Sequence, residues 1–185
     1  MKKLILASVS PRRKELLSSA GFSFLVVPSK FEELDNLSKK EDIAVNNALG
    51  KAKDVFGKQD EEVCVVGADT IVLIDNIVLG KPKTKEEAYK MLKLLSNRVH
   101  TVITGYAIIN KEKTISGYSQ TNVLFNNLTK QQILDYIETG SPMDKAGAYG
   151  VQDAPELVKK YEGYISTVIG LPIEEIAPII KEMIK

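Results

Sequence analysis

Two adjacent arginines, Arg12 and Arg13, stand where the chain is expected to begin a helix. In the segment LILASVSPRRKELL, residues 4–17, a short apolar run indicates a buried strand before that helix. Ser10 suits the N-cap and Pro11 the first helical position. Because the helix dipole favours acidic residues at this end, two arginines are unusual there. They are either solvated by chance or, with the unpaired N–H groups of the first turn, bind an anion such as phosphate.

Asp69 is the second unusual residue, because it interrupts the most apolar stretch of the chain, VCVVGADTIVLI at residues 63–74. An unpaired buried carboxylate is costly, so an acidic residue in such a strand normally has a cation, a metal or a catalytic task. The alternative is a strand position that faces water. Gly67 and Ala68 favour the first interpretation, since small residues allow something to approach the backbone closely.

Other charged residues are ambiguous when each is taken alone. Lys81 precedes a proline that restricts its backbone, and Lys51 borders an apolar helix face, where its stem could simply cover apolar surface. Glu32 and Glu33 resemble ordinary solvated loop charges. His100 has no second histidine in the chain with which to form a metal site, so we interpret it as structural.

Taken together, these residues suit a magnesium-bound polyphosphate. Carboxylates provide the hard oxygen ligands that the metal prefers, while arginines and lysines neutralise phosphate oxygens. The P-loop pattern and the G-x-G-x-x-G fingerprint are both absent, so a different phosphate-binding scheme is required. No Ser/His/Asp or Cys/His arrangement competes, and Cys64 lies in an apolar run where we expect a buried side chain.

The overall composition argues against several classes of partner. Lys and Arg total 25 against 24 Asp and Glu, so no global charge attracts nucleic acid or a membrane surface. A single cysteine excludes an internal disulfide and fits a reducing compartment. The first apolar run is too short for a signal peptide, and no run approaches membrane-spanning length. We therefore expect a cytoplasmic protein that binds neither nucleic acid nor membrane.

Strand and helix patterns alternate along the 185 residues and predict a single α/β domain, residues 1–185, with mixed strand pairing. Two lobes around an active-site cleft would be compatible with this length. Thr129 and Gln132 form a capping box, and Asp75–Asn76 indicates a turn. The expected strands cover 3–8, 22–28, 63–74, 99–109, 114–125 and 161–169, and the expected helices cover 11–20, 44–56, 88–95, 129–137 and 172–184.

Five stretches resemble the Maf family of nucleoside triphosphate pyrophosphatases, in the family's order and spacing. The resemblance implies an extended mixed β-sheet flanked by helices, with a deep central cleft, similar to inosine triphosphate pyrophosphatases. It also implies cleavage between the α- and β-phosphates, which yields a nucleoside monophosphate and pyrophosphate. The matching stretches are LILASVSPRRKELL, GADTIVLIDNIVLGKP, HTVITGYAI, PMDKAGAYGVQ and VIGLPIEE.

The same resemblance assigns roles to the charged residues and implies metal-assisted hydrolysis. Asp69, helped by Glu33 and the metal, would position and deprotonate the attacking water. Whether Asp69 binds the metal, acts as the base or does both stays open. The resemblance places Ser8, Arg12 and Arg13 in the phosphate-binding motif, Glu33 with Glu32 at the acidic position, Lys51 and Lys81 at the catalytic lysines, Asp69 at the proton acceptor, and Asp69 with Glu33 as candidate metal ligands.

Substrate class follows from three further positions of the resemblance. Arg12, Thr70 and Gln152 match the group that hydrolyses dTTP and UTP rather than the group associated with 7-methyl-GTP. The amide of Gln152 could pair with the O4/N3 edge of uracil or thymine. The segment Asp153–Glu156 departs from the glycines that often follow in the family. This stiffer, acidic segment bears on base selectivity, including the tolerance of modified pyrimidines.

Two other functions remain open at this point. One is a purine or ITP-type house-cleaning pyrophosphatase, and the other is a nucleotide-binding regulator of septation, a process with which the family was once linked. The expected cofactor is a divalent cation, Mg2+ by default, with Mn2+ or Co2+ chemically acceptable at oxygen ligands. The resemblance also allows a homodimer, which no stretch of the sequence demonstrates.

Overall fold

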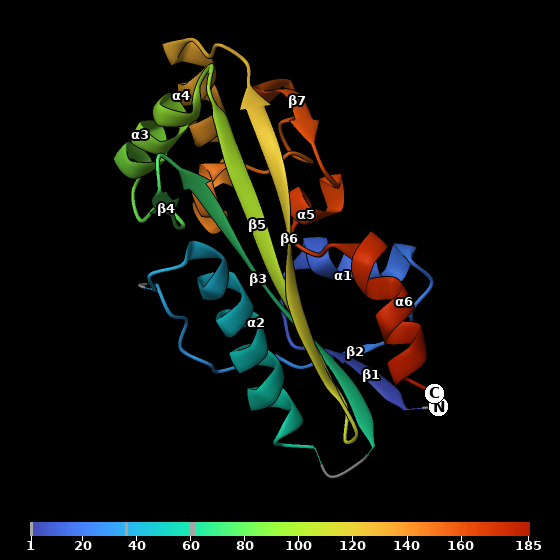
Figure 1. The fold of residues 1–185 in the computed structure, drawn as a ribbon. Coiled ribbons are helices and arrows are strands. Elements are labelled where there is room, and N and C mark those ends of the chain that lie inside the picture. The colour runs from blue at the N-terminus through green and yellow to red at the C-terminus, as the bar shows by residue number, and fades with distance from the viewer. Residues whose placement is uncertain (1, 36, 60–61) are drawn as a thin grey trace. The chain divides into compact units, whose positions relative to one another are not determined.

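A computed structural model describes residues 2–35, 37–59 and 62–185, and Figure 1 shows their helices and strands. The strands are β1 (Lys3–Leu6), β2 (Leu25–Val26), β3 (Val63–Ile74), β4 (Ile77–Leu79), β5 (Val99–Ile109), β6 (Thr114–Phe125) and β7 (Val158–Glu162). The α-helices are α1 (Pro11–Ser19), α2 (Lys40–Phe56), α3 (Lys85–Leu95), α4 (Lys130–Glu138), α5 (Ile165–Ile169) and α6 (Ile173–Met183). Short 3-10 helices cover Ser141–Asp144, Ala146–Ala148 and Pro155–Leu157.

The described strands form a seven-stranded mixed sheet in the order β2-β1-β3-β5-β6-β7, with β4 paired to β3. β1 runs parallel to both β2 and β3, with Ile5 opposite Leu25 and Val65, whereas β3–β4 and β6–β7 are antiparallel. The predicted α/β class with mixed pairing is therefore confirmed. The expectation of a deep central cleft stays a prediction.

The chain divides into two compact units, and three strands continue from one into the other. The first unit comprises Met1–Asp69, Thr104–Ser119 and Gly170–Lys185, and the second comprises Thr70–Ile103 and Gln120–Ile169. Whether these units correspond to the lobes expected from the sequence, within one domain, stays a prediction. Among the described residues, no helix combines the length and apolar content that a membrane crossing requires.

In the first unit, helices cover both faces of β1 and β3 (Figure 1). Strand side chains alternate between the faces, as the pleat requires. Leu4 and Leu6 pack in a core with residues of α1 and α6, whereas Ile5 and Ala7 pack in a core with residues of α2. Because both faces are covered, β1 and β3 are apolar almost throughout, which is typical of parallel strands inside an α/β sheet.

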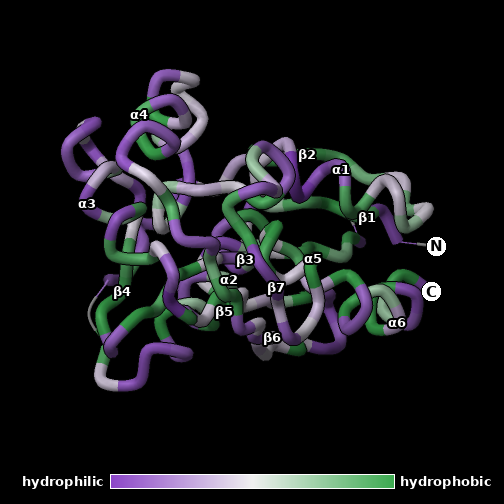
Figure 2. The backbone as a smooth tube through the Cα atoms, turned by 90° about the horizontal axis from the view of Figure 1, so that it is seen from above, coloured by the Kyte–Doolittle hydropathy of each residue, from purple (hydrophilic) through white to green (hydrophobic). Residues whose placement is uncertain are grey.

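The second unit has its own core, in which α3 and α4 contribute buried leucine, isoleucine and alanine residues against β5 and β6. Thr84 caps α3, and Thr129 forms the predicted capping box with Gln132 at the start of α4. Asp75 and Asn76 both have positive φ, as a tight hairpin turn between β3 and β4 requires. Helix α6 of the first unit carries both green and purple stretches in Figure 2, as a helix with one buried and one exposed face should.

Most predicted elements are confirmed, and the long strands 63–74, 99–109 and 114–125 have the predicted limits. Two predicted strands are wrong in part, and one strand was missed. The strand predicted at 161–169 is instead β7, which ends at Glu162, followed by helix α5. The second strand is much shorter than residues 22–28, and β4 was not predicted at all. Short segments such as these carry too few residues for a distinct hydrophobic period.

Candidate active site in the first unit

The loop after β1 positions Arg13 against two oxygen atoms. Its Nε donates to the carbonyl oxygen of Gly170 at 2.8 Å, and one terminal nitrogen donates to Ser8 Oγ at 3.2 Å. Ser8 is buried, and its hydroxyl also accepts a hydrogen bond from the backbone N–H of Ser10 at 3.3 Å. Gly170 has a φ of 123°, a conformation that favours glycine. A chain segment near the C-terminus therefore helps to orient this guanidinium group.

Helix α1 begins as the sequence predicts, with Ser10 at the N-cap and Pro11 in the first turn, although the Ser10 side chain makes no capping hydrogen bond. No acidic residue lies in the first turn. Burial lowers the pKa of Arg13, while the negative charges of Asp69 and Glu33 act to raise it. The arginine stays protonated, so a cation lies at the positive end of a helix, an arrangement that suits an anionic ligand.

Lys51 lies between the two carboxylates that the sequence singles out. Its Nζ is 2.7 Å from Asp69 Oδ1 and 2.6 Å from Glu33 Oε1. The side chains of Lys51 and Asp69 are only 12% and 10% exposed, whereas that of Glu33 is 54% exposed. Lys51 therefore does not extend its ammonium group to solvent from an apolar helix face. It compensates a buried carboxylate, and this explains how Asp69 is tolerated within an apolar strand.

Gly67 allows α2 to approach β3 closely enough for this contact. A Cβ atom at Gly67 would lie 2.3 Å from the carbonyl oxygen of Ala48 and 2.9 Å from the Cβ atom of Ala52. Only a glycine fits at that separation. The close approach inferred from Gly67 and Ala68 is thus made by a helix of the same unit. It brings Lys51, on the same helix, to Asp69, two residues further along the strand.

The acidic loop that carries Glu32 and Glu33 is attached to α2 at three successive turns. Asp54 accepts hydrogen bonds from Ser29 Oγ and from the backbone N–H of Lys30, at 2.8 and 2.7 Å. The ring of Phe31 lies where a side chain on Gly50 would be. Asn47 binds the backbone of Leu34, through 2.7 and 2.9 Å hydrogen bonds. The helix therefore sets the path of the loop.

Sequence reasoning missed Asn47. Its amide also donates to Asp69 Oδ2 at 3.0 Å, and the residue is only 2% exposed. One signal was available. Residues 43, 44, 48 and 52 mark the buried face of the predicted helix, and position 47 falls on that face, four residues before Lys51. A polar residue on a buried helix face requires partners, and here these partners include Asp69.

The structure brings together Ser8, Arg13, Lys51 and Asp69 with Glu33, and places Arg12 beside Arg13 and the exposed Glu32 beside Glu33. Thr70, Lys81 and Gln152 belong to the second unit. Thr70 directly follows Asp69 in β3, Lys81 is exposed between β4 and α3, and Gln152 is exposed in the loop before Pro155–Leu157. Their part in the site stays a prediction.

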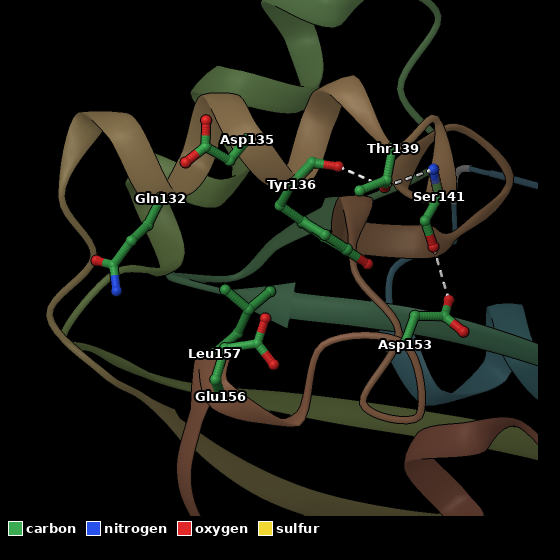
Figure 3. Close-up of a pocket in the computed structure, with 8 residues that line it drawn as sticks. All are labelled: Gln132, Asp135, Tyr136, Thr139, Ser141, Asp153, Glu156 and Leu157. Atoms are coloured by element: carbon green, nitrogen blue, oxygen red, sulfur yellow. Dashed lines mark hydrogen bonds between the residues drawn. The ribbon is translucent and has the colours of Figure 1, made fainter.

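The segment after Gln152 is tightly held within the second unit. Asp153 Oδ2 accepts a hydrogen bond from Ser141 Oγ at 2.7 Å and is 2.8 Å from the buried Lys145 Nζ. Figure 3 shows the first of these contacts at the edge of a pocket of about 630 Å³. Asp135, Asp153 and Glu156 are among the lining residues, so this pocket does not suit a triphosphate. The effect of this segment on base selectivity stays a prediction.

The carboxylates of Glu33 and Asp69 are the candidate metal ligands. Both contact Lys51 Nζ, so their oxygens converge on one small region. Within residues 2–35, 37–59 and 62–185, no group of three or more His, Cys, Asp or Glu residues is placed to hold a metal. Mg2+ commonly uses one or two carboxylates and takes its remaining oxygens from water and phosphate. The donor set fits that mode of binding.

Comparisons with known proteins agree with this arrangement. The family model described as Maf-like protein matches residues 3–183. A dTTP/UTP pyrophosphatase of Alkaliphilus oremlandii is 51% identical over 98% of this chain and 96% of its own length. Proteins of the same name are 44% identical in a Thermoanaerobacter species (97% and 95% covered) and 45% identical in Bacillus cereus (98% and 96% covered).

A solved structure of a HAM1 protein from Coxiella burnetii has a similar fold, with a TM-score of 0.53 and 18% sequence identity. The match covers 98% of this chain and 100% of that one. Since the family model spans nearly all of the sequence, and relatives are 44–51% identical over almost their full length, the resemblance seen in the motifs is confirmed. The chain is a member of the Maf family.

Proposed function

We propose that this protein hydrolyses dTTP and UTP to the nucleoside monophosphate and pyrophosphate. The observation that carries the proposal is the contact of Lys51 with Asp69 and Glu33, close to Arg13, whose guanidinium group at a helix N-terminus suits a phosphate. This arrangement occurs in a chain whose relatives, up to 51% identical over nearly the full length, are named dTTP/UTP pyrophosphatases. A protein that only bound nucleotides would have no use for a positioned buried carboxylate.

Asp69 is suited to accept the proton of the attacking water. One of its carboxylate oxygens accepts from Lys51 and the other from Asn47, which fixes the carboxylate plane. Each oxygen retains capacity for a second hydrogen bond, so water can be held and deprotonated there. Glu33, which is largely exposed, can help to orient that water. Arg13 and Lys51, with Lys81, would stabilise charge on the phosphate oxygens and on the leaving pyrophosphate.

We further propose a divalent cation, Mg2+ by default, held by Asp69 and Glu33 together with phosphate and water oxygens. When bound, such a cation polarises phosphoryl oxygens and acidifies coordinated water. The protein residues would then bind the triphosphate and orient the water, and Asp69 would hold the proton. Addition of a chelator should abolish pyrophosphate release and added Mg2+ should restore it. Full activity in the presence of the chelator would contradict this part of the proposal.

The proposal is tested by measuring pyrophosphate release from dTTP, UTP, CTP, 7-methyl-GTP and ITP with Mg2+, for the wild type and for Asp69→Asn. We expect preference for dTTP and UTP, and a loss of at least about 100-fold in the variant with nucleotide binding retained. Preference for ITP would instead indicate a purine-type house-cleaning enzyme. Binding without any hydrolysis would favour the regulator of septation, and unchanged activity of Asp69→Asn would refute the role of Asp69.

A further inference from the structure

Asn47 is a buried polar residue with three hydrogen bonds. It lies on α2, one turn before Lys51, and its neighbours Ala44 and Ala48 on the same face are fully buried. Burial of an amide is unfavourable unless its hydrogen bonds are made. Here the Oδ1 atom accepts one hydrogen bond and the Nδ2 atom donates two, so the amide has partners on both sides. The three bonds lead to only two places, Asp69 and Leu34.

On the side of α2 that faces β3, Asn47 and Lys51 each donate a hydrogen bond to a different carboxylate oxygen of Asp69. Asn47 Nδ2 donates to Oδ2 at 3.0 Å, and Lys51 Nζ donates to Oδ1 at 2.7 Å. Their spacing of four residues places both donors on one side of α2, one turn apart. A carboxylate held by one donor can rotate about that hydrogen bond, whereas two donors on different oxygens fix its plane. The orientation of Asp69 therefore depends on Asn47 as well as on Lys51.

Towards the acidic loop, Asn47 binds the backbone of Leu34, the residue after Glu33. Its side chain accepts from the Leu34 N–H at 2.7 Å and donates to the Leu34 carbonyl oxygen at 2.9 Å. The Glu33 side chain is 54% exposed, so packing alone does not hold it. The backbone anchor next to it determines where the carboxylate can reach. One amide thus connects the loop that carries Glu33 to the strand that carries Asp69.

We propose that Asn47 is a positioning residue for hydrolysis, which holds Asp69 in the orientation needed to deprotonate water and keeps Glu33 beside it. The inference rests on the proposed pyrophosphatase function and goes beyond it, because Asn47 touches neither water nor phosphate in this scheme. Loss of Asn47 should therefore lower kcat and leave KM nearly unchanged, since the phosphate groups are bound by other residues. A residue that only stabilised the fold would give no such split.

The test compares Asn47→Ala and Asn47→Asp with the matched control Asp54→Ala. Asp54 anchors the start of the same loop to the same helix, through Ser29 and Lys30, but makes no hydrogen bond to Asp69 among the contacts described. We expect kcat for dTTP to fall about 10- to 100-fold in both Asn47 variants, with KM within about threefold. Asp54→Ala should keep kcat within about threefold of the wild type.

Asn47→Asp keeps the hydrogen bond accepted from the Leu34 N–H but loses both donated bonds, to the Leu34 carbonyl oxygen and to Asp69, and its carboxylate repels Asp69. The double variant Asn47→Asp/Asp69→Asn exchanges the two groups and restores a donor–acceptor pair. It should unfold at a higher urea concentration than Asn47→Asp alone, while it remains inactive. This measurement tests the direct Asn47–Asp69 contact even if Asn47→Ala does not fold, and the kcat of Asn47→Asp then tests the positioning role. Failure of the double variant to recover would contradict a direct Asn47–Asp69 interaction.

The possible failures are distinguishable. If the wild type releases no pyrophosphate from any nucleotide, the proposed function is wrong. If the wild type is active and the Asn47 variants retain its kcat, only the positioning role is wrong. An equal loss of kcat in Asp54→Ala and Asn47→Ala would also overturn that role, because it would show that attachment of the loop, rather than orientation of Asp69, matters.

Discussion

His100 illustrates how the environment of a single residue sets its charge. Its side chain is buried in the second unit, with its ring edge-on to Phe125 and Tyr149 at centroid distances of 5.0 and 5.4 Å. Its Nε2 atom is 2.7 Å from the Tyr149 hydroxyl oxygen. Burial disfavours the charged ring and lowers the pKa of His100 from 6.5 to about 4. The residue is therefore neutral at physiological pH and packs as part of the core.

This burial predicts a loss of stability in acid. The unfolded chain binds a proton at His100 below its ordinary pKa of 6.5, whereas the folded chain does so only near pH 4. The stabilising contribution of the neutral, buried ring is therefore complete above pH 6.5 and is lost as the pH falls from 6.5 to about 4. From about pH 7 to about pH 5 the free energy of unfolding should fall by about 2 kcal/mol through this residue. Urea denaturation of the wild type and of His100→Gln at several pH values measures this decrease in the free energy of unfolding.

His100→Gln also loses ring packing, which changes stability by an amount that does not depend on pH, so the informative quantity is the slope of stability with pH. The variant should have a distinctly shallower slope over this window than the wild type. Identical slopes in the two proteins would show that His100 does not titrate between the folded and unfolded states as proposed.

At the scale of elements, the packing of α2 on β3 decides whether the proposed catalytic groups Lys51 and Asp69 meet. The closest approach is at Gly67, where a Cβ atom would lie 2.3 Å from backbone of the helix. Backbone atoms of a helix cannot move aside to relieve such a clash, whereas the end of a flexible side chain can. Any side chain at this position therefore pushes α2 away from the strand, and Lys51 moves with it.

Gly67→Ala should consequently destabilise the protein by about 2–4 kcal/mol and reduce activity beyond the loss of folded protein. Gly57→Ala, at the C-cap of α2, is a matched control, because its Cβ atom would lie 3.4 Å from the nearest atom and its φ of −65° suits alanine. Thermal unfolding and pyrophosphate release per folded molecule provide the two measurements. Wild-type behaviour of Gly67→Ala would show that the helix and strand can separate at no cost.

At the scale of the whole molecule, the residues expected to recognise the phosphates and the base belong to both units. Ser8, Arg13, Lys51 and Asp69 belong to the first unit, and so does Arg12, one of the three positions that the Maf resemblance links to substrate class. The other two, Thr70 and Gln152, belong to the second unit, as does Lys81. Guanidinium and ammonium groups recognise phosphate oxygens, which every nucleoside triphosphate has in common. Selection among bases must then come from groups with a specific hydrogen-bonding pattern, such as the amide of Gln152.

We therefore expect Arg13→Ala and Gln152→Ala to have opposite signatures. Arg13→Ala should raise KM about 10- to 100-fold for all nucleotides alike, through loss of a charged hydrogen bond. Gln152→Ala should change the ratio of kcat/KM for dTTP over ITP by about tenfold and leave triphosphate binding nearly intact. Steady-state kinetics with dTTP, UTP and ITP distinguish the two. Equal effects of both variants on affinity and on base preference would contradict this division.

Local patterns in the sequence determined much of this protein. The apolar run 63–74 predicted β3 with its correct limits, and Thr129 with Gln132 predicted the capping box. Ser10 and Pro11 predicted the start of α1. These features depend on residues that are close together in the sequence. The residue types that cause them, namely a run of apolar side chains, a capping side chain and a proline with fixed φ, can therefore be recognised in the sequence itself.

The geometry of the proposed catalytic groups was decided only by the tertiary structure. Lys51 and Asp69 are 18 residues apart, and Arg13 is 157 residues from the carbonyl of Gly170 that orients it. Lys51 alone was best explained as a lysine that covers an apolar face, and Asn47 was overlooked altogether. Contacts of this kind depend on how closely a helix packs on a strand. That distance depends on residues such as Gly67, whose lack of a side chain matters only where the two elements meet.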